Sequence, residues 1–357
     1  MANVALYGFR NLKDQFAERI SAINADVITT AIAESVAEHN RQMDALIAMF
    51  CQRTTRTQVR YKQLGAARLQ PLDENGRALP IKPSGYYDVA FPVRSAGSAW
   101  GADFVTREKM TVEDANRVTA LMTNADKIWL RDQILAGLYA DTDYTFTDPQ
   151  DGDVTVKPLA NGDAVTYARN GSTTSSTDTH QLAQAAAISD SADPFSAIYD
   201  ELVEHPENKG DVVALIPTNI KSAVTDLTGF KWLPDTNLAQ GANDTTVTGS
   251  LGIATPGEIL GYHTDKVWVV EWKALPDNYM IATTTNAEKP LAMREHEETS
   301  LQGFIQAPEQ RNDHPFYETQ WMRFAGFGGW SRIGALAYRV GNATYGNAPT
   351  GYAPPIW

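Results

Sequence analysis

The stretch RLQPLDENGRALPIKP, residues 68–83, has the composition of the tip of a long hairpin. Its centre, Asp73-Glu74-Asn75-Gly76, is a turn sequence, and the arms on both sides are interrupted by proline and poor in large apolar residues. A two-stranded hairpin that lacks an apolar face is only marginally stable in water. We therefore expect this segment to be supported by a surface that it does not provide itself.

Extended pieces with alternating side chains flank this tip. RTQVRYKQL (residues 56–64) and YYDVAFPV (residues 86–93) are the two predicted arms, and the connection between them is too long for a tight hairpin inside a packed sheet. Helices are predicted before the arms, over residues 11–24 and 26–50, because apolar residues recur there mostly at three- and four-residue steps.

The region around the tip is basic in an acidic chain. Residues 53–94 contain eight Lys or Arg and three Asp or Glu residues, a net charge of +5, whereas the whole chain carries −13. The basic residues are Arg53, Arg56, Arg60, Lys62, Arg68, Arg77, Lys82 and Arg94. Such complementarity favours docking on another copy of the same chain. A nucleic-acid patch is the alternative, although DNA-binding domains usually carry a larger basic excess.

The stretch MTVEDANRVTALMTNADKIWLRDQILAGLY, residues 110–139, predicts one long helix over residues 111–138. Thr111 and Asp114 have the spacing of a capping box, and the acidic first turn suits the helix dipole. The expected apolar stripe contains Val118, Leu121, Met122, Ala125, Trp129 and Leu135. At 1.5 Å per residue this helix would be about 40 Å long, so we interpret it as a spine.

The remainder of the chain alternates between strand and helix signals. Residues 141–180 are rich in Asp, Gly, Thr and Ser and predict surface strands with a mobile loop. Apolar strands and short helices over about residues 190–290 predict a compact α/β lobe. Residues 314–341 then contain two long aromatic-rich strand candidates separated by Gly326, Gly328 and Gly329.

Motifs for catalysis are absent from the sequence. It contains no GxSxG and no GxxxxGK[ST], and GFGGWSRIG departs from GxGxxG. The glycines around residue 328 are therefore interpreted as a strand bend that lets aromatic rings pack, rather than as a phosphate loop. We predict no catalytic residue and no cofactor.

Metal-ligating patterns are equally scarce. There is no CxxC or HExxH, so a structural zinc site is not expected, and Cys51 is interpreted as a buried, inert thiol. REHEE, residues 294–298, could place His296 and Glu298 on one face, but a solvated charged strand is the preferred interpretation. His263 and His314 adjoin turn residues, so we expect solvent or turn contacts for both. No apolar run is long enough to span a bilayer and no signal peptide is evident, so no membrane association is predicted.

The order of these elements resembles that of the major capsid proteins of tailed bacteriophages, which share the Hong Kong-type shell fold. LGYHTDKVWVVEWKALPDNYMIATTTNAEKPLAMRE, residues 260–295, is similar to that family's strand, proline-marked turn and following strand. FYETQWMRFAGFGGWSRIGALAYRVG, residues 316–341, resembles its closing strands, in which an Arg- and aromatic-rich strand turns through small residues into an Ala-rich one. The resemblance spans about residues 10–345 and implies an α+β fold.

The resemblance also implies a division of the chain into an N-terminal arm, an extended loop, a two-segment peripheral domain, an axial domain and a tail. These are residues 1–52, 53–96, 97–189 with 291–345, 190–290 and 346–357, with the spine helix 111–138 in the peripheral domain. In this family the extended loop reaches over the neighbouring subunit. The implied inter-subunit contacts are Arg60, Lys62, Arg68, Arg77 and Lys82 on the loop, and Glu113 and Asp114 at the start of the spine helix.

The implied function is that of a structural subunit, not an enzyme, that self-assembles into hexamers and pentamers of an icosahedral virus head. Its partners would be other copies of itself, packaged double-stranded DNA without sequence specificity, and scaffolding, portal and cement proteins. The implied location is the capsid shell of a virion assembled in the host bacterial cytoplasm. Some members form a Lys–Asn cross-link, for which Lys62, Lys82 and Asn342 are the right residue types, but the sequence indicates no acidic catalyst for it.

Three other functions remain open at this stage. An encapsulin-type compartment shares the fold and encloses enzymes in place of DNA. The chain could also be an enzyme with an unrecognised cleft, or a different virion component such as a head-decoration or tail protein. Closed shells or capsomers of the purified chain would indicate either of the two containers, and nuclease-protected DNA would then distinguish between them.

Overall fold

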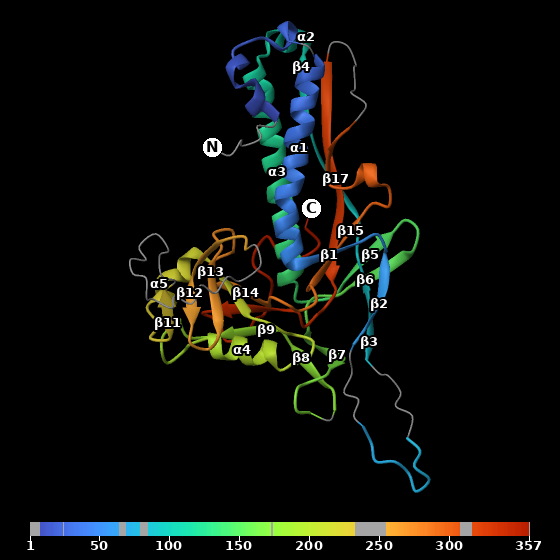
Figure 1. The fold of residues 1–357 in the computed structure, drawn as a ribbon, viewed down its shortest axis with the longest axis vertical. Coiled ribbons are helices and arrows are strands. Elements are labelled where there is room, and N and C mark those ends of the chain that lie inside the picture. The colour runs from blue at the N-terminus through green and yellow to red at the C-terminus, as the bar shows by residue number, and fades with distance from the viewer. Residues whose placement is uncertain are drawn as a thin grey trace.

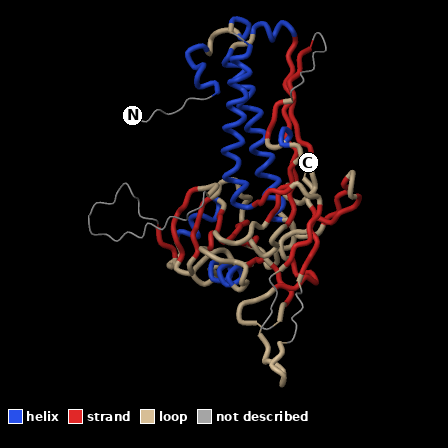
Figure 2. The backbone as a smooth tube through the Cα atoms, turned by 45° about the vertical axis from the view of Figure 1, so that its right-hand side comes forward, coloured by secondary structure: helices blue, strands red, loops and turns tan. Residues whose placement is uncertain are grey.

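The computed structural model describes residues 8–23, 25–63, 69–78, 85–172, 174–232, 255–307 and 316–356. Two long helices stand beside a sheet that contains two long strands, a second sheet forms a lobe to one side, and a narrow loop extends from the end opposite α2 (Figure 1). Figure 2 shows the same arrangement from a second direction, with both helices alongside the long strands. The molecule is therefore a mixed α+β fold, as predicted.

The helices α1 (Ala25–Phe50) and α3 (Val112–Tyr139) form the upright layer. Their first turns share one apolar cluster and their last turns share another, so the helices run side by side in the same direction. The first cluster includes Ile28, Ala31, Val112 and Ala115, and the second includes Met43, Ile47, Leu130 and Ile134. The short helix α2 (Phe104–Lys109) precedes α3. No helix among the described residues is both long and apolar enough to cross a membrane.

The start of α3 confirms the predicted capping box. The Thr111 hydroxyl accepts a hydrogen bond from the Asp114 N–H at 3.3 Å, and the Asp114 carboxylate accepts one from the Thr111 N–H at 3.0 Å. These bonds satisfy N–H groups that have no partner within the helix. The predicted apolar stripe is partly wrong, because Met122 is buried whereas Leu121 is 61% exposed. The face that meets the core also carries Thr119 and Asp126.

The first residues of the chain depart from the prediction. A continuous helix was expected over residues 11–24, but the chain forms two 3₁₀ segments, Gly8–Gln15 and Ile20–Ala22. Between them Arg19 forms an isolated bridge with Thr111, and the Ile20 N–H donates to the Met110 carbonyl at 2.9 Å. These backbone groups are bonded to the start of α3, so they are not available for one uninterrupted helix.

A five-stranded sheet lies beside the helices. Its strands are β1 (Cys51–Thr54), β15 (Leu291–Glu295), β17 (Phe316–Gly329), β16 (Phe304–Gln306) and β4 (Arg94–Asp103). β17 is 14 residues long and pairs antiparallel with β4, β15 and β16. The sequence predicted a long aromatic-rich strand here, and the structure confirms it.

Glycines in β17 allow another segment to pass close to the strand. A Cβ atom at Gly326 would lie 1.1 Å from the Pro92 carbonyl oxygen, and one at Gly328 would lie 2.4 Å from the Ala90 oxygen. A side chain at either position would therefore collide with backbone. The glycines therefore serve close packing in β17, as predicted, although they admit backbone and not only aromatic rings.

The second sheet has seven strands and forms the lobe. In spatial order these are β11 (Phe230–Trp232), β12 (Glu258–His263), β13 (Val267–Glu271), β10 (Val212–Ile216), β14 (Tyr279–Thr284), β18 (Ala335–Val340) and β9 (Gln181–Gln184). The short helices are α4 (Phe195–Val203) and α5 (Lys221–Thr225). Every residue of the central strand β10 is buried, which explains its continuous apolar sequence.

This sheet extends beyond residues 190–290. Strands β18 and β9 come from outside that range, and they add to the edge next to β14. The lobe thus includes segments of the chain that come before residue 190 and after residue 290. The division into peripheral and axial domains remains a prediction.

Three two-stranded sheets complete the fold. They pair β2 (Gln58–Lys62) with β3 (Tyr86–Ala90), β5 (Tyr144–Asp148) with β6 (Gly152–Val156), and β7 (Asn161–Tyr167) with β8 (Ser176–Thr179). The first pair confirms the predicted arms of the hairpin. The other two confirm the strands predicted within residues 141–180.

Candidate functional site

The tip of the loop forms the predicted turn. The Gly76 N–H donates to the Asp73 carbonyl at 2.9 Å, and the Asp73 carboxylate accepts from the N–H groups of Asn75 at 2.9 Å and Arg77 at 2.7 Å. Gly76 has φ = +70°, a conformation that favours glycine. The turn is therefore ordered by local hydrogen bonds.

Two leucines at this tip are largely exposed. Leu69 is 99% exposed and Leu72 is 61% exposed. The tip points away from the body of the molecule (Figure 1). Within the described residues, the segment 69–78 therefore presents apolar side chains directly to solvent.

The root of the same hairpin is firmly packed. Tyr61 and Tyr87 stack with ring centroids 5.0 Å apart, and the Tyr87 hydroxyl donates to the Trp330 carbonyl at 2.7 Å. The Tyr61 hydroxyl donates to the Glu288 carboxylate at 2.5 Å. Burial, followed by the hydrogen bond with Glu288, raises the pKa of Tyr61, so its hydroxyl keeps its proton. The hairpin is anchored at one end and unsupported at the other.

The basic residues predicted to contact a neighbouring subunit differ in whether their charge is already paired within the chain. Arg60 forms a two-pronged pair with Asp88 on the facing strand, at 2.8 and 3.0 Å, and lies over the Tyr86 ring. Its charge is thus compensated within the hairpin. The side chains of Lys62 and Arg77 are exposed. The remaining two predicted contacts, Arg68 and Lys82, lie outside the described residues.

The predicted acidic contacts are at the start of α3. Glu113 pairs with Arg117 at 2.9 Å, both side chains being exposed, whereas the Asp114 carboxylate is engaged by Thr111. These hydrogen bonds lower the pKa of Asp114. Figure 1 places the start of α3 beside α2, at the end of the molecule opposite the loop tip. The structure therefore does not bring the predicted basic and acidic contacts together within one chain.

A buried ion pair that the sequence did not reveal joins the two helices to β17. The Arg323 guanidinium donates to both carboxylate oxygens of Asp126, at 2.6 and 2.8 Å, and His39 Nε2 lies 2.7 Å from the same carboxylate. The side chains of Arg323 and Asp126 are each 2% exposed. Burial alone would raise the pKa of Asp126, but the hydrogen bonds and the Arg323 charge lower it below its ordinary value.

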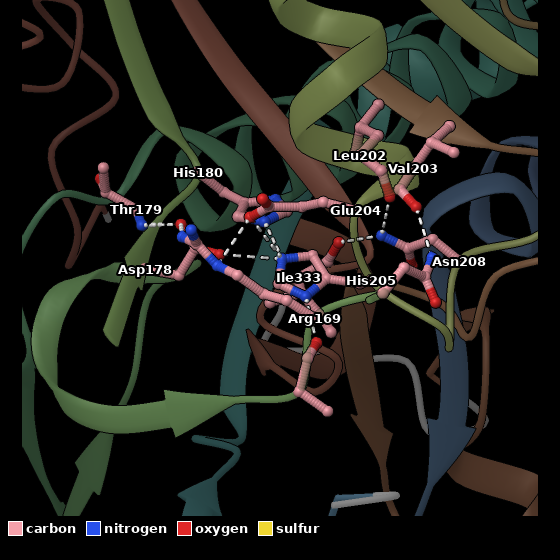
Figure 3. Close-up of polar contacts among 12 residues, drawn as sticks. Arg169, Asp178, Thr179, His180, Leu202, Val203, Glu204, His205, Asn208 and Ile333 are labelled. Carbon is pink, nitrogen blue, oxygen red and sulfur yellow. Dashed lines mark hydrogen bonds and ion pairs between the residues drawn. The ribbon is translucent and has the colours of Figure 1, made fainter. Parts of the chain in front are cut away.

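A second unpredicted group of polar residues lies where β8, β9 and α4 meet, as Figure 3 shows. His180 and His205 are fully buried, with their Nε2 atoms 3.1 Å apart. Asp178 Oδ2 lies 2.9 Å from His205 Nε2, and Glu204 Oε1 lies 3.7 Å from it. Arg169 reaches the cluster from the end of β7, 3.1 Å from both Asp178 and Glu204.

The electrostatics of this cluster reflect burial and crowding. Burial, followed by the neighbouring His205, lowers the pKa of His180 to about 4, so its ring is neutral at pH 7. Burial and the Asp178 carboxylate raise the pKa of both Glu201 and Glu204 above their ordinary values. The cluster thus brings several electron-pair donors together with a single cationic side chain, Arg169, from the described part of the chain.

The end of α4 is held in place by side-chain amides, which fixes His205. Asn208 donates to the carbonyls of Leu202 and Ile333 at 2.9 and 2.8 Å, and Asn170 donates to the Val203 carbonyl at 2.8 Å. The bonds to Leu202 and Val203 satisfy carbonyls that lack partners at the end of a helix. The histidine that follows is therefore rigidly placed.

Two predictions about other histidines require correction. His263 was expected at solvent or in turn contacts, but it is 1% exposed, stacks on Phe195 with centroids 4.8 Å apart, and lies between Asp193 at 3.1 Å and Asp265 at 3.4 Å. The Asp265 N–H does contact its ring, so the turn contact is present. His314 lies outside the described residues.

The charged stretch 294–298, expected to be a solvated strand, is buried in its first part, and the strand ends at Glu295. Arg294 pairs with Asp148 at 2.9 Å, and Glu295 is 3% exposed. Leu291, Ala292 and Met293 of β15 pack into the core and bury this strand, whereas Glu297 and Glu298 beyond its end are exposed. Cys51, predicted to be a buried thiol, is 4% exposed, and burial raises its pKa.

Comparisons with known proteins place the chain by fold. No protein-family model and no curated protein matches the sequence. Among solved structures, a chain from Mycobacterium phage Patience matches with a TM-score of 0.65 and 18% identity, over 98% of this chain and 97% of that one. Chains from the capsid of a native GTA particle and of the cyanophage P-SCSP1u both match with TM-scores of 0.48, at 11% and 12% identity. They cover 84% and 82% of this chain, and 90% and 86% of their own lengths.

Proposed function

Because this chain has the fold of tailed-phage major capsid proteins, we propose that it is a structural shell subunit of a virus head. In this proposal it self-assembles into hexamers and pentamers of an icosahedral capsid that encloses double-stranded DNA. A fold by itself hosts many functions, so the proposal needs a feature of this chain's own surface. That feature is the loop tip, residues 69–78.

The loop tip is the observation that carries the proposal. Complete burial of a leucine side chain contributes about 1.5–3 kcal/mol, and Leu69 and Leu72 make little of that contribution in the isolated chain. The root is packed around Tyr61 and Tyr87, and the turn at the tip is ordered by its own hydrogen bonds, so less entropy is lost when a neighbour covers the tip. A second copy of the chain is the proposed cover.

Charge supports the same arrangement. Arg77 at the tip, together with Arg68 and Lys82, would face the acidic start of α3 on a neighbouring copy. Glu113 is the available acidic partner, because its exposed pair with Arg117 contributes little and can be exchanged. Asp114 is needed by its own helix. Since the tip and the start of α3 lie at opposite ends of one chain, only two copies can bring them together (Figure 1).

The remaining parts of the proposal concern the assembled particle. The net charge of −13 favours a container that does not hold its DNA tightly, because like charges repel. We place the subunit in the capsid shell of the virion, assembled in the host bacterial cytoplasm, with scaffolding, portal and cement proteins as further partners. We propose a structural and not a catalytic role.

The test is assembly of the purified chain with and without its loop. Light scattering and negative-stain microscopy should show closed shells or capsomers for the full chain. Deletion of Leu69 to Ile81 should leave a folded subunit, by circular dichroism, that assembles poorly. A matched control replaces the exposed turn residues Gln150 and Asp151 by serine and should assemble normally.

Two results would contradict this reasoning. One is a full chain that stays a well-folded monomer under all assembly conditions, and the other is a deletion that unfolds the subunit but leaves assembly intact. If particles form, DNA that survives nuclease treatment indicates a virus head. Particles that protect protein cargo and no DNA would instead indicate an encapsulin-type compartment.

A further inference from the structure

The two buried histidines are held with their electron pairs facing each other. His180 Nδ1 lies 2.9 Å from the Ala335 carbonyl oxygen, and His205 Nδ1 lies 2.9 Å from the Ala168 carbonyl oxygen. A carbonyl oxygen can only accept a hydrogen bond, so each Nδ1 carries the proton. In the neutral rings both Nε2 atoms are then unprotonated, yet they lie 3.1 Å apart. Two unprotonated nitrogens at this distance repel unless a positive species lies between them.

Asp178 adds a third electron-pair donor at the same point. Its Oδ1 accepts from the Thr179 N–H at 2.7 Å and pairs with Arg169 at 3.1 Å. Its Oδ2 lies 2.9 Å from His205 Nε2 but has no hydrogen-bond donor among the described residues, although the side chain is 3% exposed. A buried carboxylate oxygen without a donor is costly and needs a compensating partner.

We propose that this cluster is a zinc site, in which His180 Nε2, His205 Nε2 and Asp178 Oδ2 bind one Zn²⁺ ion and Glu204 Oε1 completes the coordination. The three donor atoms lie within 4.8 Å of one another. With bonds of about 2.0–2.1 Å, two tetrahedral zinc ligands lie about 3.3 Å apart. The observed 3.1 and 2.9 Å are within a few tenths of an ångström of that spacing.

The surroundings fit zinc in two further respects. Each histidine donates its other ring nitrogen to a backbone carbonyl, which is the usual way in which a zinc-binding imidazole is oriented. Glu204 Oε1 is buried and has no hydrogen-bond partner in the described part of the chain, while the Glu204 side chain as a whole is 27% exposed. Glu204 therefore lies between the buried ligands and solvent, on the side from which an ion can enter.

The charge of the cluster also matches a divalent cation. Asp178, Glu201 and Glu204 have their carboxylate oxygens within 4.8 Å of one another, and Arg169 is the cation that pairs with two of them. With neutral histidines and all three carboxylates ionised, the state that a bound cation favours, the net charge is −2. One Zn²⁺ ion neutralises it, which removes the mutual repulsion of the carboxylates.

The ion would join separate parts of the fold. Asp178 belongs to β8, His180 precedes β9 at the edge of the seven-stranded sheet, and Glu204 and His205 follow α4 (Figure 3). Zinc would thus fasten the β7–β8 hairpin to the lobe as a structural site. This role concerns stability of the single subunit and does not depend on the proposed assembly.

Another buried histidine, His263, provides a contrast. Asp193 and Asp265 lie near opposite ring nitrogens of His263, at 3.1 and 3.4 Å. The two carboxylates thus face different nitrogens of one imidazole, and a single ion cannot bind both of those nitrogens. His263→Gln is therefore a matched control: it removes a buried histidine without touching the proposed ligands.

The test measures zinc binding and stability of the purified full chain. Chelator-treated protein at pH 7.5 should take up about one zinc ion per chain, measured by mass spectrometry of the metal after desalting. A free zinc concentration of about one hundred times Kd should raise Tm by about 3–5 °C. Co²⁺ in place of zinc should give the visible absorption of a tetrahedral nitrogen and oxygen site.

Variants identify the ligands. Asp178→Asn and His180→Gln should each lower zinc affinity by about tenfold or more, whereas His263→Gln should retain it. If His180→Gln fails to fold, Asp178→Asn and the Co²⁺ spectrum of the unaltered chain decide the question. Absence of bound zinc, an unchanged Tm, or full affinity in Asp178→Asn would overturn the proposal. If the metal-free chain is more stable at pH 5 than at pH 8, the side chains of the cluster share a proton in place of a zinc ion.

Discussion

The buried pair between Asp126 and Arg323 allows a quantitative prediction. Substitution of Asp126 by alanine removes both hydrogen bonds to the guanidinium and the contact with His39, at 2.6, 2.8 and 2.7 Å. The Arg323 side chain is 2% exposed, so its charge would remain buried without a carboxylate. Removal of one partner from such a pair costs about 3–5 kcal/mol, against a total stability of about 5–15 kcal/mol.

Urea unfolding followed by tryptophan fluorescence measures this loss. Trp321 is 2% exposed and lies two residues before Arg323 on β17, so its emission reports on this part of the core. With an m-value of about 3 kcal/mol/M, the unfolding midpoint of Asp126→Ala should fall by about 1 M or more. The double variant Asp126→Leu with Arg323→Met should recover much of the stability, because neither charge is then left buried.

The chain contains a matched pair at the surface. Arg60 and Asp88 form the same two-pronged geometry, but their side chains are 57% and 42% exposed. Asp88→Ala should leave the unfolding midpoint unchanged, because water and salt screen an exposed pair. Equal shifts for Asp126→Ala and Asp88→Ala, or a loss below about 1 kcal/mol for Asp126→Ala, would show that burial does not control the strength of this interaction.

Three further outcomes follow from the structure. Folding lowers the pKa of Asp126, so its ionised carboxylate stabilises the fold above the unfolded-state pKa of about 3.9, and this stabilisation is lost as the pH falls through the folded-state pKa. Asp126→Asn should therefore lose less stability than the unaltered chain between pH 5 and pH 2. The measurement is the urea unfolding midpoint as a function of pH. Gly326→Ala should prevent folding into a soluble subunit, judged by expression and circular dichroism, because its Cβ would lie 1.1 Å from the Pro92 carbonyl oxygen. Combined Arg68→Glu and Arg77→Glu should weaken assembly in light scattering more at low salt than at high salt, because salt screens exposed charges.

The predictions for Gly326→Ala and for the Arg68 and Arg77 variant each have a control at a comparable position. A Cβ at Gly152 would meet nothing within 4 Å, and φ there is +74°, so Gly152→Ala should cost only about 1 kcal/mol of backbone strain and leave a soluble subunit. Lys209 is exposed and distant in sequence from the loop, and Lys209→Glu should leave assembly unchanged. Insolubility of Gly152→Ala would contradict the explanation given for Gly326→Ala. An assembly defect in Lys209→Glu equal to that of the Arg68 and Arg77 variant would contradict the role given to the charge of the loop.

Local patterns in the sequence predicted several elements correctly. The start of α3 could be read from Thr111 and Asp114, because a capping box needs only residues three positions apart. The turn at Asp73 to Gly76 also depends on neighbouring residues alone. Composition also predicted a hairpin tip without a core of its own, because its arms are interrupted by proline and contain few large apolar residues.

Other features depend on which surfaces meet. α3 carries apolar residues on more than one face, and the sequence does not say which face is covered, so Leu121 was expected in the stripe but is exposed. His263 was expected at solvent because it adjoins a turn. The packing of Phe195 from α4 against its ring buries it instead.

By itself, then, the sequence determined the two long helices, the turn, the order of elements and the region of basic charge, because these depend on residues close together in the chain. Only the tertiary structure brought His39 within 2.7 Å of Asp126, and His180 within 3.1 Å of His205. The members of each pair are 87 and 25 residues apart. Their chemistry arises from desolvation and close approach, and neither quantity exists until the chain has folded.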